Sequence, residues 1–296
     1  MKSNPLLRVI IFSVGTLVCL GLLVSNILFS SLSLRPNSHR VDISATEMPE
    51  NLEQIYMTTE IQNIEIDWVC GSIIFETGTG LNEIIVTELR GVENSEPMVY
   101  KQNGQTLKIQ YSKDLNFKSF GFNAIGEKSL IITVPEEWAG RTVSIETASA
   151  DVTMAGIRLD EFEFDGASGN CSMTNCYIQE IDMDSASGDI SFTGSLDVLD
   201  CDAASANCTI EVWNIPKVID FDAASGDLDL ILPEDAGFTC NTNTVSGIFK
   251  TDFDCSTTGS NTHHHGDGSC KINVDAMSGD VTIYKGTGHH PDSNHH

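Results

Sequence analysis

The chain has 296 residues, and its 42 Asp and Glu residues against 16 Lys and Arg residues give it a net charge of −26 at pH 7. This balance excludes a nucleic-acid-binding protein, which needs a basic surface, and it disfavours docking on anionic lipid headgroups. The acidity is explained either by the solubility of an exposed surface or by a partner of positive charge.

The first part of the chain is predicted to anchor it in a membrane. Residues 9–30 carry no charged side chain and follow Lys2 and Arg8. An apolar segment of about 20 residues spans the hydrocarbon core as a helix, whereas the apolar core of a cleaved signal peptide has about 7–15 residues. We therefore expect a cytoplasmic N-terminus at 1–8, an uncleaved signal anchor at 9–30 and a linker at 31–50. The remainder of this single-pass cell-membrane protein would be extracytoplasmic; a cleaved signal peptide is the alternative.

Residues 51–142 are predicted to form an N-terminal β region. Apolar and acidic residues alternate at 64–68, and apolar residues alternate at 130–134 before Pro135. The Asn-Gly pair at 103–104 lies between two short apolar stretches, which is typical of a β-hairpin. We expect this region to cap the repeats that follow it or to contribute irregular turns of the same coil.

Residues 143–285 contain seven copies of a small-residue corner, written Ser-Ala/Gly-Asp/Asn in most copies. Successive corners lie 18–21 residues apart, except that 32 residues separate the last two. A fixed period near 20 residues is typical of stacked repeats. The corner serines are Ser149, Ser168, Ser187, Ser205, Ser225, Ser246 and Ser278.

Apolar and polar residues alternate on both sides of each corner, as Ile145 and Val152 show around Ser149. A period of two predicts strands with one buried face. One repeat cannot bury its inner side chains alone, so the repeats must stack. We therefore predict an all-β fold, a parallel β-solenoid (β-helix) of about seven regular rungs preceded by irregular β-rungs or a cap, plus one N-terminal transmembrane helix.

Turn-forming residues recur at fixed places in the repeat. Gly188 and its equivalents follow the corner serine, and glycine adopts a positive φ at no steric cost. Seven residues after the first three corners stand Gly156, Asn175 and Gly194, which tolerate a left-handed turn. We expect these residues to serve the coil rather than a ligand, so that Gly188→Val should destabilise the fold.

Several stretches resemble the DUF4097 family of candidate bacterial adhesins. They are the opening strand pair at 64–75, the strand at 130–135 that ends in proline, and the Ser-Gly-Asp corners at 187–189, 225–227 and 278–280. The resemblance covers most of the chain beyond the linker. It implies an envelope-associated β-solenoid, often behind a transmembrane segment, without established catalytic residues.

Acidic residues recur three and five positions before the corners, so we expect them in two columns on one outward sheet face. Neighbouring rungs lie about 4.8 Å apart, a distance at which two like charges cost roughly 1 kcal/mol even in water. Three explanations are open: Ca²⁺ or Mg²⁺ held between rungs, a cationic partner docking on the face, or solvated charge that deters aggregation. The residues are Glu146, Asp165, Asp184, Asp202, Asp222 and Asp275, and Glu163, Asp182, Asp200 and Asp220.

Histidines gather in two places, the long gap before the last corner and the C-terminal tail at 286–296, which is predicted to be disordered. Imidazole groups bind Zn²⁺, Ni²⁺ and Cu²⁺, so the two segments could share a metal ion if they meet; a flexible polar segment is the alternative. The candidate ligands are His263, His264, His265, Asp267, His289 and His290.

Six of the nine cysteines fall into two groups. Cys255 and Cys270 flank the long gap, and a disulfide between them would contribute about 3 kcal/mol in the chain-entropy model. Four others fall in inward columns and are interpreted as small buried apolar residues: Cys171, Cys201, Cys208 and Cys240.

The sequence contains no catalytic motif, and no acidic pair is distinguished from the others on the columns. We therefore expect a binding surface rather than an enzyme, without a cofactor unless Ca²⁺ or Zn²⁺ binds as above. The expected partners are the membrane, through the N-terminal helix, and a protein or a surface glycan. The alternative is an envelope-stress or signalling accessory that binds a protein partner or a divalent cation.

Overall fold

The computed structural model describes residues 52–91, 96–113 and 127–286, and within these ranges it contains strands and no helix. The all-β prediction is therefore confirmed for this part of the chain. No helix in the described ranges is long and apolar enough to cross a membrane. The predicted membrane helix at 9–30 and the histidine tail lie outside the described residues.

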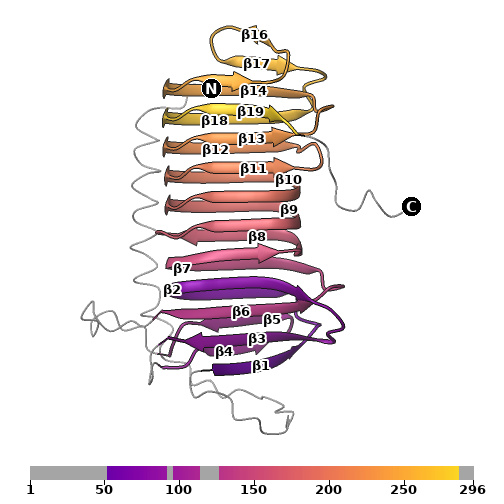
Figure 1. Ribbon diagram of the computed structural model, residues 1–296, viewed down its shortest axis with the longest axis vertical. Helices are drawn as coiled ribbons and strands as arrows, with labels where there is room; N and C mark the ends of the chain where they lie inside the picture. Colours follow the sequence, from indigo (N-terminus) through magenta and orange to yellow (C-terminus); the bar gives the residue numbers. More distant parts are fainter. Residues whose placement is uncertain (1–51, 92–95, 114–126, 287–296) are drawn as a thin grey trace, which may run out of the picture.

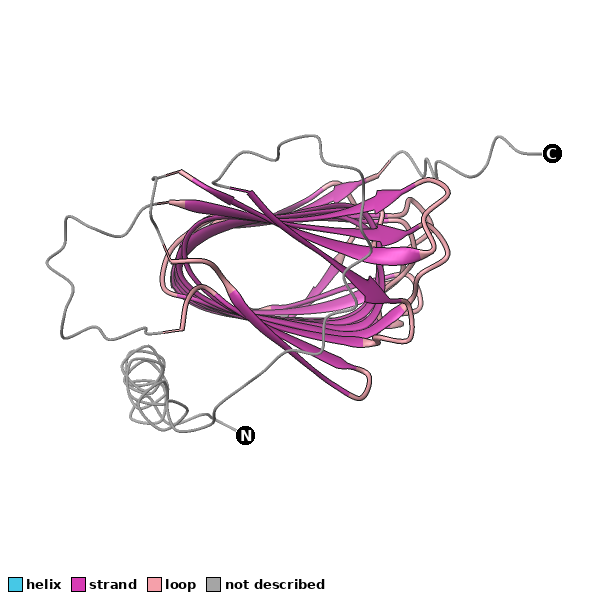
Figure 2. Ribbon diagram, turned by 90° about the horizontal axis from the view of Figure 1, so that it is seen from below, coloured by secondary structure: helices cyan, strands magenta, loops and turns pink. Residues whose placement is uncertain are grey.

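The strands stack along the long axis of the molecule in two layers that face each other across the interior (Figures 1 and 2). Strands that pass through a corner belong to both layers, because the chain bends there and continues on the opposite side. Inward side chains fill the space between the layers, and Ile145, Val152, Phe162 and Phe192 are at most 1% exposed. The alternation read from the sequence thus corresponds to one buried and one outward face of each strand.

Antiparallel strands close the N-terminal end of the stack. β1 pairs with β3, and β3 pairs with β6, while β4 and β5 form a hairpin at the predicted place with its turn at Gly104 and Gln105. Both β5 and β6 then pair parallel to β2. These strands are β1 (Leu52–Thr58), β2 (Asn63–Gly78), β3 (Glu83–Arg90), β4 (Val99–Asn103), β5 (Thr106–Gln110) and β6 (Lys128–Pro135).

A buried ion pair lies within this closed end. Lys128 Nζ is 2.9 Å from Glu88 Oε1, and the two side chains are 2% and 0% exposed. Lys128 also donates to the backbone oxygens of Glu96 and Tyr111, and Met98 N donates to Glu88 Oε1. Burial lowers the pKa of Lys128, and the hydrogen bond to Glu88 opposes that shift. Nothing in the sequence pattern singled out this pair, because its partners come from separate strands.

The regular register begins at β2 rather than at residue 143. β2 pairs parallel to β7 along its length, and Asp67 lies beside Glu146 while Cys70 takes the place of a corner serine beside Ser149. The predicted boundary between residues 142 and 143 therefore does not mark the start of the regular stack.

The rungs that follow are stacked in chain order. Their corner serines lie side by side, as Ser187, Ser205 and Ser225 show. The strands are β7 (Gly140–Ala155), β8 (Arg158–Gly166), β9 (Cys171–Ser187), β10 (Ile190–Ser205), β11 (Cys208–Val212), β12 (Val218–Ser225) and β13 (Leu228–Leu232).

The C-terminal rung departs from chain order. β18 pairs with β12 on one side and with β14 on the other, and β19 likewise lies between β13 and β15. Ser278 consequently stacks on Ser225, and Ser246 stacks on Ser278. The 32-residue spacing reflects this insertion together with the hairpin of β16 and β17. These strands are β14 (Phe238–Ser246), β15 (Phe249–Thr251), β16 (Ser256–Thr258), β17 (Thr262–His265), β18 (Cys270–Ser278) and β19 (Val281–Lys285).

A side-chain ladder two residues after the corners follows the same order. In each rung the Oδ1 atom of an Asp or Asn accepts a hydrogen bond from the backbone N–H of the equivalent residue in the next rung, at 2.7–3.3 Å. The ladder ends at Ile248, whose N–H donates to Asp280 but whose side chain accepts nothing. Its members are Asp151, Asn170, Asp189, Asn207, Asp227, Asp280 and Ile248.

Two different constraints select glycine or asparagine at the turns: a positive φ and the close approach of a neighbouring strand. Asn175 and Gly156 have φ values of 56° and 70°, as the sequence predicts, and Gly188 has φ of 123°. A Cβ atom on Gly188 would also lie 2.0 Å from the carbonyl oxygen of Gly169 in the rung below. Gly194 needs no positive φ; a Cβ atom there would lie 1.9 Å from the Cys176 oxygen, so close packing requires glycine.

Candidate functional site

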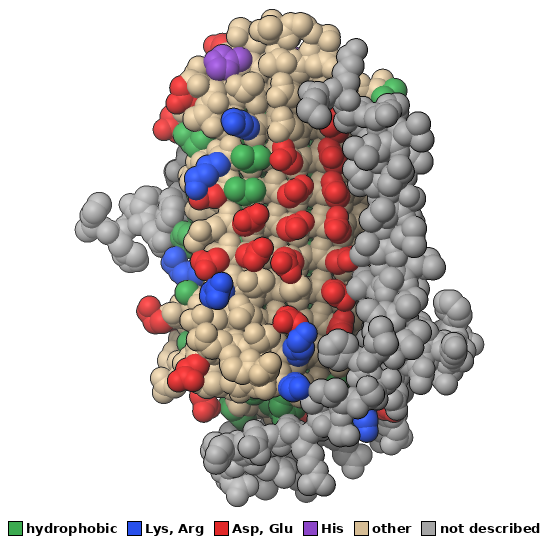
Figure 3. Space-filling model, turned by 180° about the vertical axis from the view of Figure 1, so that it is seen from behind, with side chains coloured by type: hydrophobic (Ala, Val, Ile, Leu, Met, Phe, Trp, Pro, Cys, Tyr) green, Lys and Arg blue, Asp and Glu red, His purple; other side chains and the backbone are tan. Residues whose placement is uncertain are grey.

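One outward sheet face carries stacked carboxylates, which we call the acidic face. Its first column contains seven carboxylates, each beside the next across paired strands (Figure 3). The parallel register brings them together because each of these rungs carries its acid three residues before the corner position. The first column is Asp67, Glu146, Asp165, Asp184, Asp202, Asp222 and Asp275, and the second column is Glu163, Asp182, Asp200 and Asp220.

The structure confirms that the ten predicted carboxylates share this face and adds Asp67. The repeat pattern does not indicate Asp67, because the repeats with a corner serine begin at residue 143. A signal was present, since Ile64 to Asp67 repeats the apolar-polar alternation of Val143 to Glu146, its register partners.

Donor side chains lie at both ends of the acidic face, whereas its middle rungs have no ion pair with Lys or Arg in the described part of the chain. At the lower end Gln110 Nε2 donates to Asp67 Oδ2 at 3.0 Å, and Lys108 forms an ion pair with Glu65. At the upper end Asn273 Nδ2 donates to Asp220 Oδ1 at 2.6 Å. In the middle rungs, within the described part of the chain, no Lys or Arg forms an ion pair with the carboxylates Asp165, Asp182, Asp184, Asp200 or Asp202.

Partial burial, with a further contribution from neighbouring carboxylates, raises the pKa values on this face. The pKa of Glu146 rises to about 7, first because partial burial disfavours its charged form and then because Asp67 lies beside it. The pKa of Asp202 rises to about 6 through partial burial and the charge of Asp222. Partial burial is also the largest cause of the raised pKa in each of Asp165, Asp182, Asp184 and Asp200. Glu146 is therefore partly protonated near neutral pH.

The opposite outward face has a different chemistry. Four residues after the corners, hydroxyl side chains stack across paired strands, and Ser191 Oγ donates to Ser172 Oγ at 3.0 Å. We call this the hydroxyl face; one carboxylate, Asp229, interrupts it. Its members are Thr153, Ser172, Ser191, Thr209 and Thr282.

The acidic face presents a regular array of negative charge to solvent without a closed ligand cage. In the described ranges, no three His, Cys, Asp or Glu side chains converge to hold a metal ion. Such an array attracts an extended cation, because each added positive group meets an equivalent carboxylate one rung further on.

The histidines of the gap do not converge on one another. They belong to β17, where successive side chains point to opposite sides. His263 stacks on Phe249 with ring centroids 3.8 Å apart, and His265 Nδ1 lies 2.8 Å from the Asp254 oxygen. On the other side His264 Nδ1 lies 3.0 Å from Thr239 Oγ1.

The carboxylate of Asp267 is also engaged, because its Oδ1 atom accepts from the backbone N–H of Ser269 at 3.0 Å. The predicted grouping of His263, His264, His265 and Asp267 is thus not formed. His289 and His290 lie outside the described residues, so their part in a metal site stays a prediction.

All cysteines in the described ranges are free, so the predicted Cys255–Cys270 disulfide is not formed in this structure. Cys270 opens β18 and is fully buried beside Phe238, because the inserted rung places it in the stack rather than at the edge of a loop. The four cysteines assigned to inward columns are buried, as predicted: Cys171, Cys201, Cys208 and Cys240. Cys201 Sγ and Cys208 Sγ lie 3.5 Å apart across one corner.

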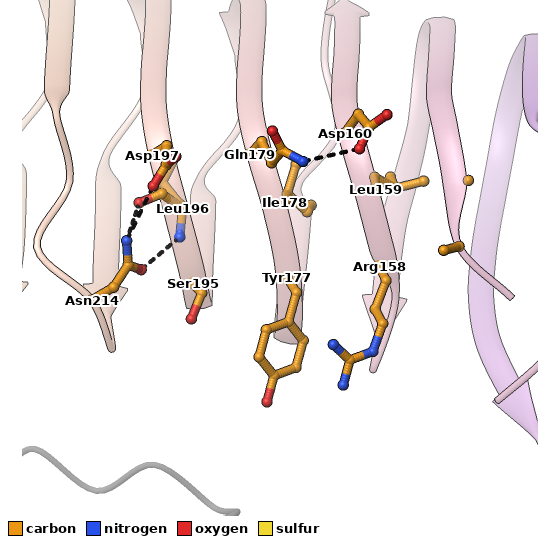
Figure 4. A pocket seen from close by; sticks show the side chains of 12 residues that line it. Arg158, Leu159, Asp160, Tyr177, Ile178, Gln179, Ser195, Leu196, Asp197 and Asn214 are labelled. Carbon is orange, nitrogen blue, oxygen red and sulfur yellow. Dashed lines mark hydrogen bonds between the residues drawn. The ribbon is translucent and has the colours of Figure 1, made fainter. Parts of the chain in front are cut away.

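A shallow depression lies at the return turns opposite the corners (Figure 4). The Arg158 guanidinium lies 4.2 Å from the Tyr177 ring centroid, and Gln179 Nε2 donates to Asp160 Oδ1 at 3.0 Å. Asn214 exchanges two hydrogen bonds of 2.9 Å with the backbone of Leu196. These polar groups bind one another or the backbone, so they serve the turns.

Comparisons with known proteins found one matching family model and several similar solved structures. The family model described as Toastrack DUF4097 matches residues 61–284. A candidate adhesin from Bacteroides fragilis is 17% identical with a TM-score of 0.45, over 79% of this chain and 98% of its own. A candidate adhesin from Parabacteroides distasonis is 13% identical with a TM-score of 0.41, over 79% and 96%. A candidate cell adhesion protein from Clostridium sporogenes is 10% identical with a TM-score of 0.36, over 79% and 99%. No curated protein matches the chain.

Proposed function

Because the chain belongs to the Toastrack DUF4097 family, we propose that it is a membrane-anchored, extracytoplasmic binding protein of the adhesin type, and that its acidic face binds a cationic partner. The partner would be a protein or another surface polymer that presents positive groups along an extended segment. The anchor would be the apolar segment at 9–30, which is long enough to span a bilayer.

The contrast between the two outward faces carries this proposal. Both faces belong to the same rungs and have the same spacing between strands. On the hydroxyl face, Ser172 and Ser191 form a side-chain hydrogen bond across neighbouring strands. The acidic face instead stacks like charges, and partial burial together with the neighbouring Asp67 raises the pKa of Glu146 to about 7. Fold and solubility do not require that arrangement, so we infer that a partner uses it.

A cationic partner would relieve the crowding on the acidic face. Positive groups within about 4–6 Å favour the charged form of a carboxyl group. Binding would therefore lower the raised pKa values and release protons near neutral pH. The proposal includes no catalysis, because equivalent carboxylates repeat from rung to rung and no nucleophile or base sets one of them apart in the described ranges.

Binding of a lysine-rich peptide to the full-length protein tests the proposal. We expect the triple variant Asp182→Asn, Asp200→Asn, Asp202→Asn to bind at least about tenfold more weakly, since each charge pair contributes up to about 1 kcal/mol. The matched control removes the same number of charges elsewhere: Glu211→Gln, Asp229→Asn and Glu234→Gln. Equal weakening by both variants would show a general charge effect, and absent binding to the wild type would reject the proposal.

The raised pKa values favour a second candidate, a signalling accessory of the envelope that senses a protein partner or a divalent cation through the same face. Glu146, with a pKa of about 7, changes its charge in the range where such a sensor would respond. Calorimetry with Ca²⁺ separates this candidate from the first. Heat of binding that the triple variant loses would support it, and no heat at millimolar Ca²⁺ would reject cation sensing.

A further inference from the structure

The last rung of the stack leaves part of its upper edge uncovered. β15 pairs only with β19, below it, and the hairpin strand β17 covers β14 only from Phe238 to Asn241. The edge from residue 243 to residue 251 therefore faces no strand of the described part of the chain. An unpaired strand edge offers a row of backbone donors and acceptors to another strand.

Large apolar side chains surround this edge. The residue before the corner serine is alanine in five rungs, but it is Val245 and Met277 in the two uppermost rungs, and these side chains are 85% and 62% exposed. Ile248, on the other side of the same corner, is 60% exposed. The five alanines are Ala148, Ala167, Ala186, Ala204 and Ala224.

Electrostatics select the direction from which a second molecule can approach. The acidic face repels another copy from the side, since the chain carries a net charge of −26. At the upper end, Asn241, Asn243 and Asn273 occupy the positions that carry carboxylates in the middle rungs. Like-charge repulsion is thus reduced at the end that exposes the apolar side chains.

The geometry also favours a contact between the same end of two copies of the chain. The Asp and Asn ladder stops at Ile248, so this rung lacks the acceptor that would continue the stack. At the opposite end the outermost strands, β1 and β4, belong to antiparallel pairs and lack the corner register of β15, so the two ends do not match in a head-to-tail fibre. A contact that joins the same patch of two copies forms a closed dimer with twofold symmetry.

We propose that this uncovered end docks on the same end of a second copy of the chain. The two β15 edges pair antiparallel, and Val245, Ile248 and Met277 of each copy become buried in the contact. The first strand, β1, lies at the opposite end of the stack (Figure 1), so copies held by their N-terminal segments would meet tip to tip. That adhesive role between opposing membranes rests on the proposed membrane anchor, whereas the dimer itself does not.

Sedimentation equilibrium of the full-length protein in detergent tests the dimer. We expect a concentration-dependent dimer whose association constant falls at least about tenfold in the double variant Val245→Glu, Ile248→Glu. The control Leu89→Glu, Ile215→Glu changes two other exposed apolar residues and should leave the association constant unchanged. Both variants are checked for an unaltered thermal melt. A monomeric wild type, or equal weakening in both variants, would overturn the proposal.

Two further measurements keep this proposal separate from the function of the acidic face. The Val245→Glu, Ile248→Glu variant should bind the lysine-rich peptide as the wild type does, and the acidic-face triple variant should still dimerise. Loss of peptide binding alone would affect only the proposed function. Liposomes that carry the full-length protein should cluster, and those that carry the Val245→Glu, Ile248→Glu variant should not. Dimers without clustering would overturn the adhesive role.

Discussion

The two outward faces of the coil show what the fold needs and what it does not. On the hydroxyl face, Ser172 and Ser191 bond to each other across neighbouring strands. On the acidic face, the equivalent neighbours Asp182 and Asp200 have raised pKa values, because partial burial and nearby carboxylates disfavour their charge. The same backbone thus accepts a hydrogen-bonded column on one side and a column of like charges on the other, and the proposed binding role accounts for the second column.

The largest effect should come from breaking the corner that joins the two faces. Gly188→Val places a branched side chain at a residue whose φ is 123°. Its Cβ atom would lie 2.0 Å from the backbone oxygen of Gly169. Backbone strain and displacement each cost about 1–3 kcal/mol, so we expect a loss of about 4 kcal/mol in the free energy of unfolding.

Thermal melts of the full-length protein measure this loss. Gly80→Val is the matched control, because Gly80 has a positive φ of 69° but no atom within 4 Å of its Cβ position. It should therefore show the cost of backbone strain alone. An unchanged melting temperature in Gly188→Val would contradict the stacking of the corners.

Neutralising the middle of the acidic face should stabilise the protein. The quadruple variant Asp182→Asn, Asp184→Asn, Asp200→Asn, Asp202→Asn removes two vertical pairs of like charge. Each pair costs roughly 1 kcal/mol, so the free energy of unfolding at pH 7 should rise by about 2 kcal/mol. Urea denaturation gives this value, and a decrease would show that these carboxylates stabilise the fold.

Placing a like-charge pair on the hydroxyl face should have the opposite effect on a smaller scale. Ser172→Asp with Ser191→Asp replaces one side-chain hydrogen bond by repulsion between neighbouring strands. We expect a loss of about 1 kcal/mol at pH 7. The variant Ser172→Ala, Ser191→Ala isolates the contribution of the hydrogen bond. Equal stability of the two variants would mean that the repulsion is screened completely.

The smallest effect should be the pH dependence of stability. The pKa values of Glu146 and Asp202 rise from 4.5 to about 7 and from 3.8 to about 6 on folding. Between these limits the folded protein binds more protons than the unfolded chain, so stability falls as the pH rises from about 4 to 7. Solvent screening of these half-exposed groups keeps the change below about 1 kcal/mol.

Melting temperatures at pH 5 and pH 8 measure this change. We expect the higher value at pH 5, and a smaller difference in the quadruple Asn variant. The depressed pKa values of Asp267 and Asp280 act only below their ordinary value of 3.8, outside this window. A higher melting temperature at pH 8 would contradict the assigned direction of the shifts.

The regular part of the fold was predictable because each repeat carries its own evidence. A buried side chain at every second position and a small corner residue at a fixed period determine the register, and the columns of the acidic face follow from that register. Asp67 was not predicted to lie on the acidic face, because Cys70 replaces the corner serine in its rung.

The order of the last rungs was harder to predict, because the repeat pattern that defines a rung does not determine which other rung it pairs with. β18 fits between β12 and β14 with the same corner pattern that a position at the end would use. One local signal exists, since Ile248 stands where all other rungs of the ladder carry Asp or Asn and thereby marks the end of the stack. The metal and disulfide predictions relied on where histidines and cysteines stand in the sequence, which does not determine whether their side chains converge.

Proton release on binding tests the role of the acidic face most directly. Calorimetry of the full-length protein with a lysine-rich peptide at pH 7, in two buffers of different ionisation enthalpy, gives the number of protons released. The raised pKa values of Glu146 and Asp202 predict net proton release, which the double variant Glu146→Gln, Asp202→Asn should reduce together with its affinity. Binding without proton release, or with equal release in that variant, would contradict a partner seated on the acidic face.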